Sequence, residues 1–232
     1  LEDYTGFTCG NCPKAADAAK QAEAQFAGRV VVMAVHAGFF AEPTPQHPKD
    51  YRTPAGEELD VYFGISAAGN PNGMVNRKSF NGGRIIAYGS WGDAIAAELQ
   101  QPLKAFLKIE PSYNGSNVSA SVSIKYKEAG SASDHLVLCL VEDSVIGYQK
   151  DYRFTPSDIY DFKHMHMLRR SINGTWGEAV SSTAPAAGQT ITKQYQFTLN
   201  PDWNVSKCKL VAYLQNNTTK EVIQATEVHL AE

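Results

Sequence analysis

Two cysteines near the start of the sequence, Cys9 and Cys12, enclose Gly10 and Asn11 and are followed by Pro13. A Cys-x-x-Cys pair has three chemical uses: a redox couple, half of a metal site, or a permanent structural disulfide. A zinc site needs further ligands, and neither a second Cys-x-x-Cys nor a close Cys/His pair accompanies this one in the first part of the chain. The spacing therefore favours a redox couple or a structural bridge over a metal site.

The pair falls where a strand is expected to end and a helix to begin. A strand over residues 1–5 and a helix over residues 13–27 would place Cys9 at the positive end of the helix dipole, where a thiolate is stabilised. Thiol-disulfide exchange needs one thiolate that attacks and a second thiol that resolves the mixed disulfide. We expect an accessible Cys9 to attack and a more buried Cys12 to resolve.

Residues 1–107 alternate strand-like and helix-like stretches. The apolar run 30–35 predicts a buried strand, and Thr53 with Pro54 predicts the start of a helix. Two short strands joined by an Asn-Gly-Gly turn follow, and a helix over about 91–107, bent by a proline, closes the order β, α, β, α, β, β, α. A redox pair is expected at the first strand-to-helix turn of such an order.

Beyond residue 107 the pattern changes to short strands separated by turn clusters. This change predicts two domains, 1–107 and 108–232, the second an antiparallel β-sandwich. Its strands are expected at 118–126, 135–142, 164–171, 190–199, 207–215 and 221–230.

The first domain resembles the thioredoxin superfamily. Asp3 lies six residues before Cys9, where thioredoxins carry a buried carboxylate that moves a proton to or from the resolving thiol. Asn70-Pro71 corresponds to the cis-proline that thioredoxins place beside their disulfide. The resemblance implies that Pro71 is cis and shapes a substrate groove.

Two departures limit this resemblance. Thr8 replaces the usual aromatic residue, and the pair 10–11 holds neither the proline nor the histidine of the common redox variants, so no redox potential is implied. Plainer interpretations also exist: Asp3 as a surface-paired strand carboxylate, and Pro71 as a trans turn proline.

His36 directly follows the strand expected at 30–35. Parallel strands end at the same edge of a sheet, so His36 is expected near the sulfurs, where an imidazole can stabilise a thiolate. The alternative is a hydrogen-bonded histidine at a strand end with no chemical role. The candidate catalytic residues are Cys9, Cys12, Asp3, Pro71 and His36.

A second resemblance covers nearly the whole chain. Residues 1–13 look like the opening of the so-called 28-kilodalton outer-membrane protein family of Bacteroides-type bacteria, and segments 140–143 with Gln149, 164–169 and 174–178 are similar to its later signatures. The resemblance implies an exported, lipid-anchored protein in the periplasm or at the outer membrane and cell surface of a Gram-negative bacterium. It also implies a fold class: an α/β thioredoxin-like domain followed by an all-β immunoglobulin-like antiparallel sandwich.

Two further pairs of residues have open interpretations. Cys139 and Cys208 fall in separate strands, where a disulfide would close a loop of about 70 residues and add about 4 kcal/mol. Their aliphatic surroundings fit buried thiols equally.

His164 and His166 are expected on one face of a strand, where two imidazoles can begin a metal site, although no further ligand can be named. The plainer interpretation ties them to a loop or to the acidic pair 142–143.

The composition excludes some partners. With 21 basic and 24 acidic residues the net charge is −3, and no basic block is present, so nucleic acid is not an expected partner. The longest apolar runs hold six residues, far short of the roughly 20 that a membrane helix needs. The sequence starts with Leu1, so we expect any signal peptide or lipid anchor, and with it any membrane contact, to lie upstream.

Two functional hypotheses follow. The leading one is an exported thiol-disulfide oxidoreductase that acts on protein thiols or disulfides and uses no cofactor or metal. The alternative is a non-catalytic surface binding or adhesion protein, in which the first domain is a scaffold and Cys9–Cys12 a structural disulfide. Substrate, direction of exchange and oligomeric state do not follow from the residues.

Overall fold

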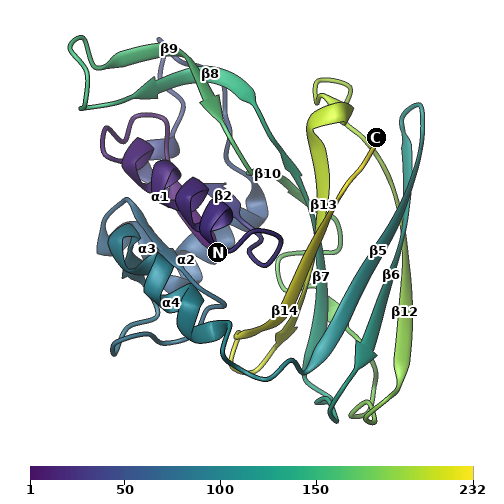
Figure 1. The fold of residues 1–232 in the computed structure, drawn as a ribbon. Coiled ribbons are helices and arrows are strands. Elements are labelled where there is room, and N and C mark those ends of the chain that lie inside the picture. Colours follow the sequence, from purple (N-terminus) through teal and green to yellow (C-terminus); the bar gives the residue numbers. More distant parts are fainter. Residues whose placement is uncertain (232) are drawn as a thin grey trace. The chain divides into compact units, whose positions relative to one another are not determined.

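The structure is a computed structural model that describes residues 1–231 (Figure 1). Contacts between residues divide the chain into two compact units. Unit 1 comprises residues 1–100 and 143–169, and unit 2 comprises residues 101–142 and the described chain from residue 170 onward. A segment from the middle of the sequence thus belongs to the unit that the first hundred residues form.

A small mixed sheet lies at the centre of unit 1. Strand β1 (Glu2–Thr5) runs parallel to β2 (Met33–His36) and antiparallel to β3 (Asn72–Met74), which pairs with β4 (Ile86–Ala87). The first residue of β10 (Met167–Ser171) pairs with β2 on its other side. Every residue of β1 and β2 is buried, as is typical of strands that are covered on both faces.

The helices of unit 1 begin and end at local sequence signals. Helix α1 buries Ala15, Ala19 and Ala22, whose spacing places them on one face. Helix α2 begins where the Thr53 side chain accepts the Gly56 N–H at 3.0 Å. The helices and 3-10 turns are α1 (Cys12–Gln25), η1 (Phe39–Ala41), α2 (Pro54–Phe63), α3 (Ile65–Ala68), η2 (Tyr88–Ser90) and α4 (Trp91–Glu98).

Residues 143–169 form a hairpin that projects past the start of α1 (Figure 1). Its strands are β8 (Val145–Lys150) and β9 (Asp158–His164), which pair antiparallel. The segment is unusual in exposing large apolar side chains. These side chains belong to Ile146, Tyr152, Phe154, Tyr160 and Met165.

Unit 2 holds two antiparallel sheets around one apolar core. In one sheet β13 lies between β7 and β14, and the short β11 also pairs with β7; in the other, β6 lies between β5 and β12. Alternate residues of β6 are buried, so one face of its sheet covers the core. The elements are β5 (Ala105–Asn114), β6 (Asn117–Tyr126), β7 (Asp134–Glu142), β11 (Glu178–Ala179), β12 (Thr190–Thr198), η3 (Val205–Lys207), β13 (Cys208–Asn216) and β14 (Val222–His229).

The predicted fold class, an α/β thioredoxin-like domain followed by an immunoglobulin-like sandwich, is wrong. The chain is mostly β with 19% helix, and no α/β thioredoxin-like arrangement is evident. Local patterns predicted elements but not which elements pair with one another. The strand beside β2 starts at Met167, far along the chain. Residues 105–107 were expected to continue a helix but begin β5. The fold therefore lends no support to a redox function, and any such case must come from the residues around Cys9 and Cys12.

Candidate functional site

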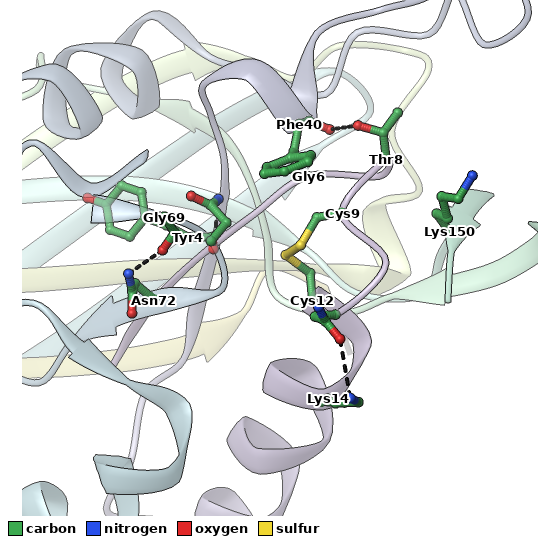
Figure 2. The surroundings of a disulfide bond; sticks show 12 residues. Tyr4, Gly6, Thr8, Cys9, Cys12, Lys14, Phe40, Gly69, Asn72 and Lys150 are labelled. Carbon is green, nitrogen blue, oxygen red and sulfur yellow. Dashed lines mark hydrogen bonds between the residues drawn. A yellow bond between two sulfur atoms is a disulfide. The ribbon is translucent and has the colours of Figure 1, made fainter. Parts of the chain in front are cut away.

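Cys9 and Cys12 form a disulfide bond at the amino end of α1 (Figure 2). Cys12 is the first residue of the helix and Pro13 the second, where a missing N–H costs no hydrogen bond. The turn into the helix is closed by the Cys12 N–H, which donates to the Cys9 carbonyl at 3.2 Å. We call residues 6–12 the disulfide loop. Its place between β1 and α1 is the one predicted.

The disulfide is sealed from solvent. Cys9 is 3% exposed and Cys12 is 1% exposed, so the expectation of an accessible Cys9 is wrong for this conformation. Thiol-disulfide exchange requires the attacking thiolate to reach a sulfur atom. A protein thiol therefore reaches Cys9 only after neighbouring residues move.

Part of the hairpin lies along the disulfide loop. We call residues 149–153 the strap. The Lys150 N–H donates to the Phe7 carbonyl at 2.8 Å, and the Tyr152 N–H donates to the Gly10 carbonyl at 2.9 Å. The strap thus attaches to the loop through main-chain hydrogen bonds from alternate residues, as an added strand does.

The Gln149 side chain links the strap to the disulfide loop. Its side chain is buried, and Nε2 donates to the Cys9 carbonyl at 3.0 Å, the Gly6 carbonyl at 3.3 Å and the Lys150 carbonyl at 2.9 Å. One amide group therefore satisfies carbonyl oxygens of the loop and of the strap. The Cys9 and Gly6 carbonyl groups also accept the Cys12 and Cys9 N–H groups, so the Gln149 amide adds a second donor to each and links the loop to the strap.

The outer part of the strap covers Gly10. A Cβ atom at Gly10 would lie 2.6 Å from the Tyr152 ring, so the ring packs directly on the glycine backbone. Tyr152 is itself 60% exposed. Beside it, Arg153 pairs with Asp151 within the strap and with Asp17 on α1.

A second segment covers the other part of the disulfide loop. The Thr8 hydroxyl group donates to the Phe40 carbonyl at 2.9 Å (Figure 2), and the Thr8 N–H donates to the same carbonyl at 3.1 Å. A Cβ atom at Gly6 would lie 2.3 Å from the Phe40 backbone carbon, so only glycine allows this approach. The loop is therefore held between η1 and the strap.

Asp3 is a buried acid on β1. Its Oδ1 atom has no hydrogen-bond partner among the residues that the structure describes. Burial raises the pKa of the Asp3 carboxyl group to about 7, and the nearby His166 partly opposes this rise. The plainer interpretation, a surface-paired carboxylate, is therefore wrong. The proton-transfer role of Asp3 stays a prediction.

His36 is also buried, and its ring nitrogens lack hydrogen bonds among the described residues. Neither ring nitrogen has a hydrogen-bond partner within residues 1–231, and the ring centroid lies 5.3 Å from that of His164 and 5.4 Å from that of Tyr51. Burial, together with the nearby His164 and Arg169, lowers the pKa of His36 well below its usual value. The ring is therefore neutral near pH 7 and lacks the charge that would stabilise a thiolate. The hydrogen-bonded alternative is wrong as well.

His164 and His166 do not share a strand face. His164 ends β9, where burial lowers the pKa of its ring to about 4. His166 follows with a φ of 53°, which interrupts the strand predicted over 164–171. Its Nε2 lies 3.0 Å from a Glu23 oxygen of α1 and its Nδ1 lies 3.2 Å from an Asp143 oxygen. The interpretation of His166 as a tie to the acidic pair 142–143 is confirmed.

The Asn70–Pro71 peptide bond is cis, as the resemblance implied. Asn70 Nδ2 donates to the Tyr4 carbonyl of β1 at 3.3 Å. Gly69 and Asn72, on either side of this bond, lie in the surroundings of the disulfide (Figure 2). That Pro71 shapes a substrate groove stays a prediction.

The other two cysteines are not joined by a disulfide. Cys139 on β7 and Cys208 on β13 are buried thiols. The two strands are neighbours, but their register places Cys139 opposite Val211 and Cys208 opposite Glu142. The buried-thiol interpretation is confirmed.

A family comparison now identifies the chain. The family model described as outer membrane protein Omp28 matches residues 57–232. The chain belongs to the Omp28 family. The family named by the second resemblance is thus confirmed over residues 57–232, whereas the likeness of residues 1–13 lies outside the match and the thioredoxin-like part is not shown. The match begins beyond the disulfide loop, so Omp28 membership by itself assigns nothing to Cys9 and Cys12.

One solved structure supports the fold of this Omp28-family chain, and a second is similar over about half of it. A crystal structure of a protein from Agrobacterium tumefaciens is 14% identical, with a TM-score of 0.57, over 100% of this chain and 93% of that chain. A domain of the outer membrane lipoprotein Omp28 from Porphyromonas gingivalis is 16% identical, with a TM-score of 0.38, over 56% of this chain and 90% of that chain. No curated protein matches.

The chain is an exported protein of the cell envelope, as its Omp28 membership indicates. None of the helices within residues 1–231 combines the length and the apolar character that a membrane-spanning helix needs.

Sequence reasoning missed the strap residues of this Omp28-family protein. Gln149 entered only as part of a family signature, and Tyr152 was not singled out. The available signal was the density of aromatic residues over 148–162 in an otherwise polar stretch. Nothing in their spacing links these residues to a cysteine 140 positions earlier, because the contact is purely tertiary.

Proposed function

We propose that this Omp28-family protein exchanges thiols and disulfides with other proteins of the envelope through Cys9 and Cys12. The observation that carries the proposal is the position of the disulfide at the amino end of α1, in the same unit as the buried acid Asp3. A helix amino end stabilises a thiolate. A carboxyl group with a pKa of about 7 gives and takes protons at neutral pH.

The reaction starts from the oxidised pair. A thiolate of a partner dithiol attacks Sγ of Cys9. A partner–Cys9 disulfide forms as the Cys9–Cys12 bond breaks. Cys12 leaves as a thiolate, which then takes up a proton. The second partner thiolate then attacks the partner sulfur and releases Cys9. Two electrons pass from the partner to the pair. In reverse, Cys9 attacks a partner disulfide and Cys12 resolves the mixed disulfide.

Two other predicted site residues have roles in this proposal. Asp3 supplies and accepts the proton of the Cys12 thiol, and Pro71 borders the surface that a partner contacts. Support for Asp3 comes from its burial and its raised pKa. Burying a carboxyl group is unfavourable for folding, and such groups with shifted pKa values are common at functional sites. His36 is left out because its neutral ring cannot balance the charge of a thiolate.

Cysteine variants test the proposal. Cys9→Ser is expected to abolish reduction of a model protein disulfide by the reduced protein, because the attacking sulfur is lost. Cys12→Ser is expected to accumulate mixed disulfides on non-reducing gels, because the resolving sulfur is lost. The double variant is the control. Activity of the double variant equal to that of the unmodified protein would refute the proposal.

The burial of both sulfurs favours a second candidate, a binding or adhesion protein in which the disulfide is static. A bridge between residues three apart constrains the unfolded chain by only about 2 kcal/mol in the chain-entropy model, so its structural benefit is modest. The reduction potential separates the candidates. A value below about −300 mV indicates a structural bridge, whereas a value in the range of the known exchange proteins supports exchange.

We further propose that the protein faces the periplasm or the cell surface and is held there by a lipid anchor attached upstream of Leu1. Membership of an outer membrane protein family supports this location. Protease treatment of intact cells distinguishes the two faces, since only a surface-exposed chain is digested.

A further inference from the structure

We propose that the strap occupies the docking position of an extended polypeptide partner, which reaches Cys9 by displacing the strap and pairing with the same loop carbonyl groups. This inference rests on the proposed function and names its substrate class: an extended, incompletely folded segment that carries thiols. Strap and disulfide loop both belong to unit 1, so their contact is internal to one compact body.

The first support is the pattern of main-chain hydrogen bonds. Lys150 and Tyr152 donate to Phe7 and Gly10, at 2.8 and 2.9 Å. Donors two residues apart on one edge are the pattern of an extended segment, and such pairing needs no particular side chain. Any extended polypeptide can therefore replace the strap at these two carbonyl groups.

The second support is the modest attachment of residues 152 and 153, which lie beyond the buried Gln149 and Asp151. Outside the strap itself, these two residues are attached by the main-chain bond from Tyr152 to Gly10 and by an exposed pair between Arg153 and Asp17, and such pairs stabilise little. Tyr152 keeps most of its surface in solvent while covering Gly10. Segments with few buried apolar contacts open locally at low cost.

The third support is the apolar surface beside the strap. Tyr152, Phe154 and Tyr160 are exposed on the hairpin, although most large apolar side chains of the chain are buried. Exposed aromatic groups next to main-chain acceptors that are freed when the strap is displaced fit a partner that offers main-chain amides and apolar side chains. An incompletely folded polypeptide offers both, whereas a folded one has already paired and buried them.

Strap variants test the shielding. Tyr152→Ala removes the ring over Gly10, and Gly10→Ala forces that ring away, since the new Cβ would lie 2.6 Å from it. Both are expected to raise the rate of Cys9–Cys12 reduction by dithiothreitol at least ten-fold. Ile146→Ala, at an exposed position of β8 on the same hairpin, is the matched control and is expected to leave the rate unchanged. Equal rates for all four proteins, each shown to be folded by circular dichroism, overturn the inference.

Peptides test the docking mode. The probe is a reduced decapeptide of extended character with one central cysteine, and its control carries N-methyl groups on the two residues flanking that cysteine. Methylation removes donors for the loop carbonyl groups, so each lost hydrogen bond is expected to slow mixed-disulfide formation about five-fold. Equal rates for the two peptides overturn the docking position.

The two proposals fail separately. If the strap variants react faster with dithiothreitol but the cysteine variants show no role in protein disulfide exchange, the exchange function is overturned and the shielding stands. If exchange depends on both cysteines while strap and peptide effects are absent, the strap inference is overturned and the exchange function stands.

Discussion

The Asp3 side chain extends from a strand whose residues are all buried, between Ala34 and Gly73 on the neighbouring strands. A carboxyl group there loses its hydration, so the neutral form is favoured and the pKa rises to about 7. An aliphatic residue of similar size would avoid this cost. The presence of a titratable group at this position is consistent with the proton-transfer role proposed for Asp3.

Asp3→Asn is expected to remove a pH dependence of stability. In the unfolded chain Asp3 ionises near 3.8, whereas in the folded protein it stays protonated up to about pH 7, so the free energy of unfolding falls as pH rises between these values. At pH 8 the asparagine variant is expected to be more stable by up to about 4 kcal/mol, and at pH 3 by little. Urea unfolding across this range measures the difference. An unchanged slope in the variant would show that Asp3 does not titrate in this window.

The predicted site residues are of two kinds. Cys9 and Cys12 were found because local sequence reports the start of a helix, whereas the cis-proline at Pro71 and the buried carboxylate at Asp3 were implied by the thioredoxin resemblance. The pKa values of Asp3 and His36 were not predicted, because a pKa depends on what surrounds the side chain. His36 illustrates this: the ring that lies 5.3 Å away belongs to His164, far along the sequence.

At the level of elements, the hairpin of β8 and β9 was not predicted. Its sequence alternates polar and aromatic residues without a buried face, which is typical of an exposed loop. The hairpin forms because its inner side packs on other segments of unit 1: the Tyr148 ring stacks on His47 at 3.6 Å and lies 6.1 Å from Phe7. No window of local sequence contains those partners.

Gln149→Ala is expected to loosen both the strap and the disulfide loop. The change removes a side-chain donor to the Cys9, Gly6 and Lys150 carbonyl groups, whereas the Cys9 and Gly6 carbonyls keep their main-chain donors. The free energy of unfolding is therefore expected to fall by about 0.5–1.5 kcal/mol. Hydrogen exchange followed by mass spectrometry is expected to show faster exchange over residues 6–12 and 149–153.

Gln149→Glu is the matched variant, since it keeps the shape but turns oxygen atoms toward carbonyl oxygens. Its effect is expected to exceed that of the alanine variant at neutral pH. Gln194→Ala, at an exposed position on β12, is the control and is expected to leave exchange in the strap unchanged. Protection equal to that of the unmodified protein in all three variants would contradict the role given to Gln149.

Elements with their own start and stop signals were predicted well. The helix expected to start at Thr53 and Pro54 forms as α2 over Pro54–Phe63, with its Thr53 cap and a left-handed Gly64 at its end. The helix expected over 91–107 ends at Glu98 instead, because its last apolar residues pair with β6 as part of β5. Cross-strand pairing outweighed the local helical pattern there.

At the scale of the whole molecule, the chain leaves unit 1 after residue 100, returns to it for residues 143–169, and leaves again. Each unit has its own buried apolar clusters. The change of pattern near residue 107 signals the start of the strand-rich unit, but the return has no such signal. The residues that cover the disulfide come from this return.

Thiol counting tests the cysteine assignment of the entire chain. Of the four cysteines, two are expected to react with iodoacetamide in the unfolded, unreduced protein, since Cys139 and Cys208 are thiols. After reduction four are expected, and in the folded, unreduced protein none, because both thiols are buried. Mass spectrometry gives the number directly. An unfolded, unreduced chain with no reactive thiol would indicate a Cys139–Cys208 bond instead.

By itself, the sequence determined the position of the cysteine pair, the strand before it and the helix after it, the capped second helix, most strands of unit 2, and the family. These features depend on interactions between residues close together along the chain, such as caps, turns and apolar periodicity. Only the tertiary structure decided that the pair is bonded and sealed, that Asp3 holds its proton to about pH 7, and that the strap covers the disulfide loop. Burial, proton affinity and shielding depend on atoms from segments more than a hundred residues apart, which local sequence does not specify.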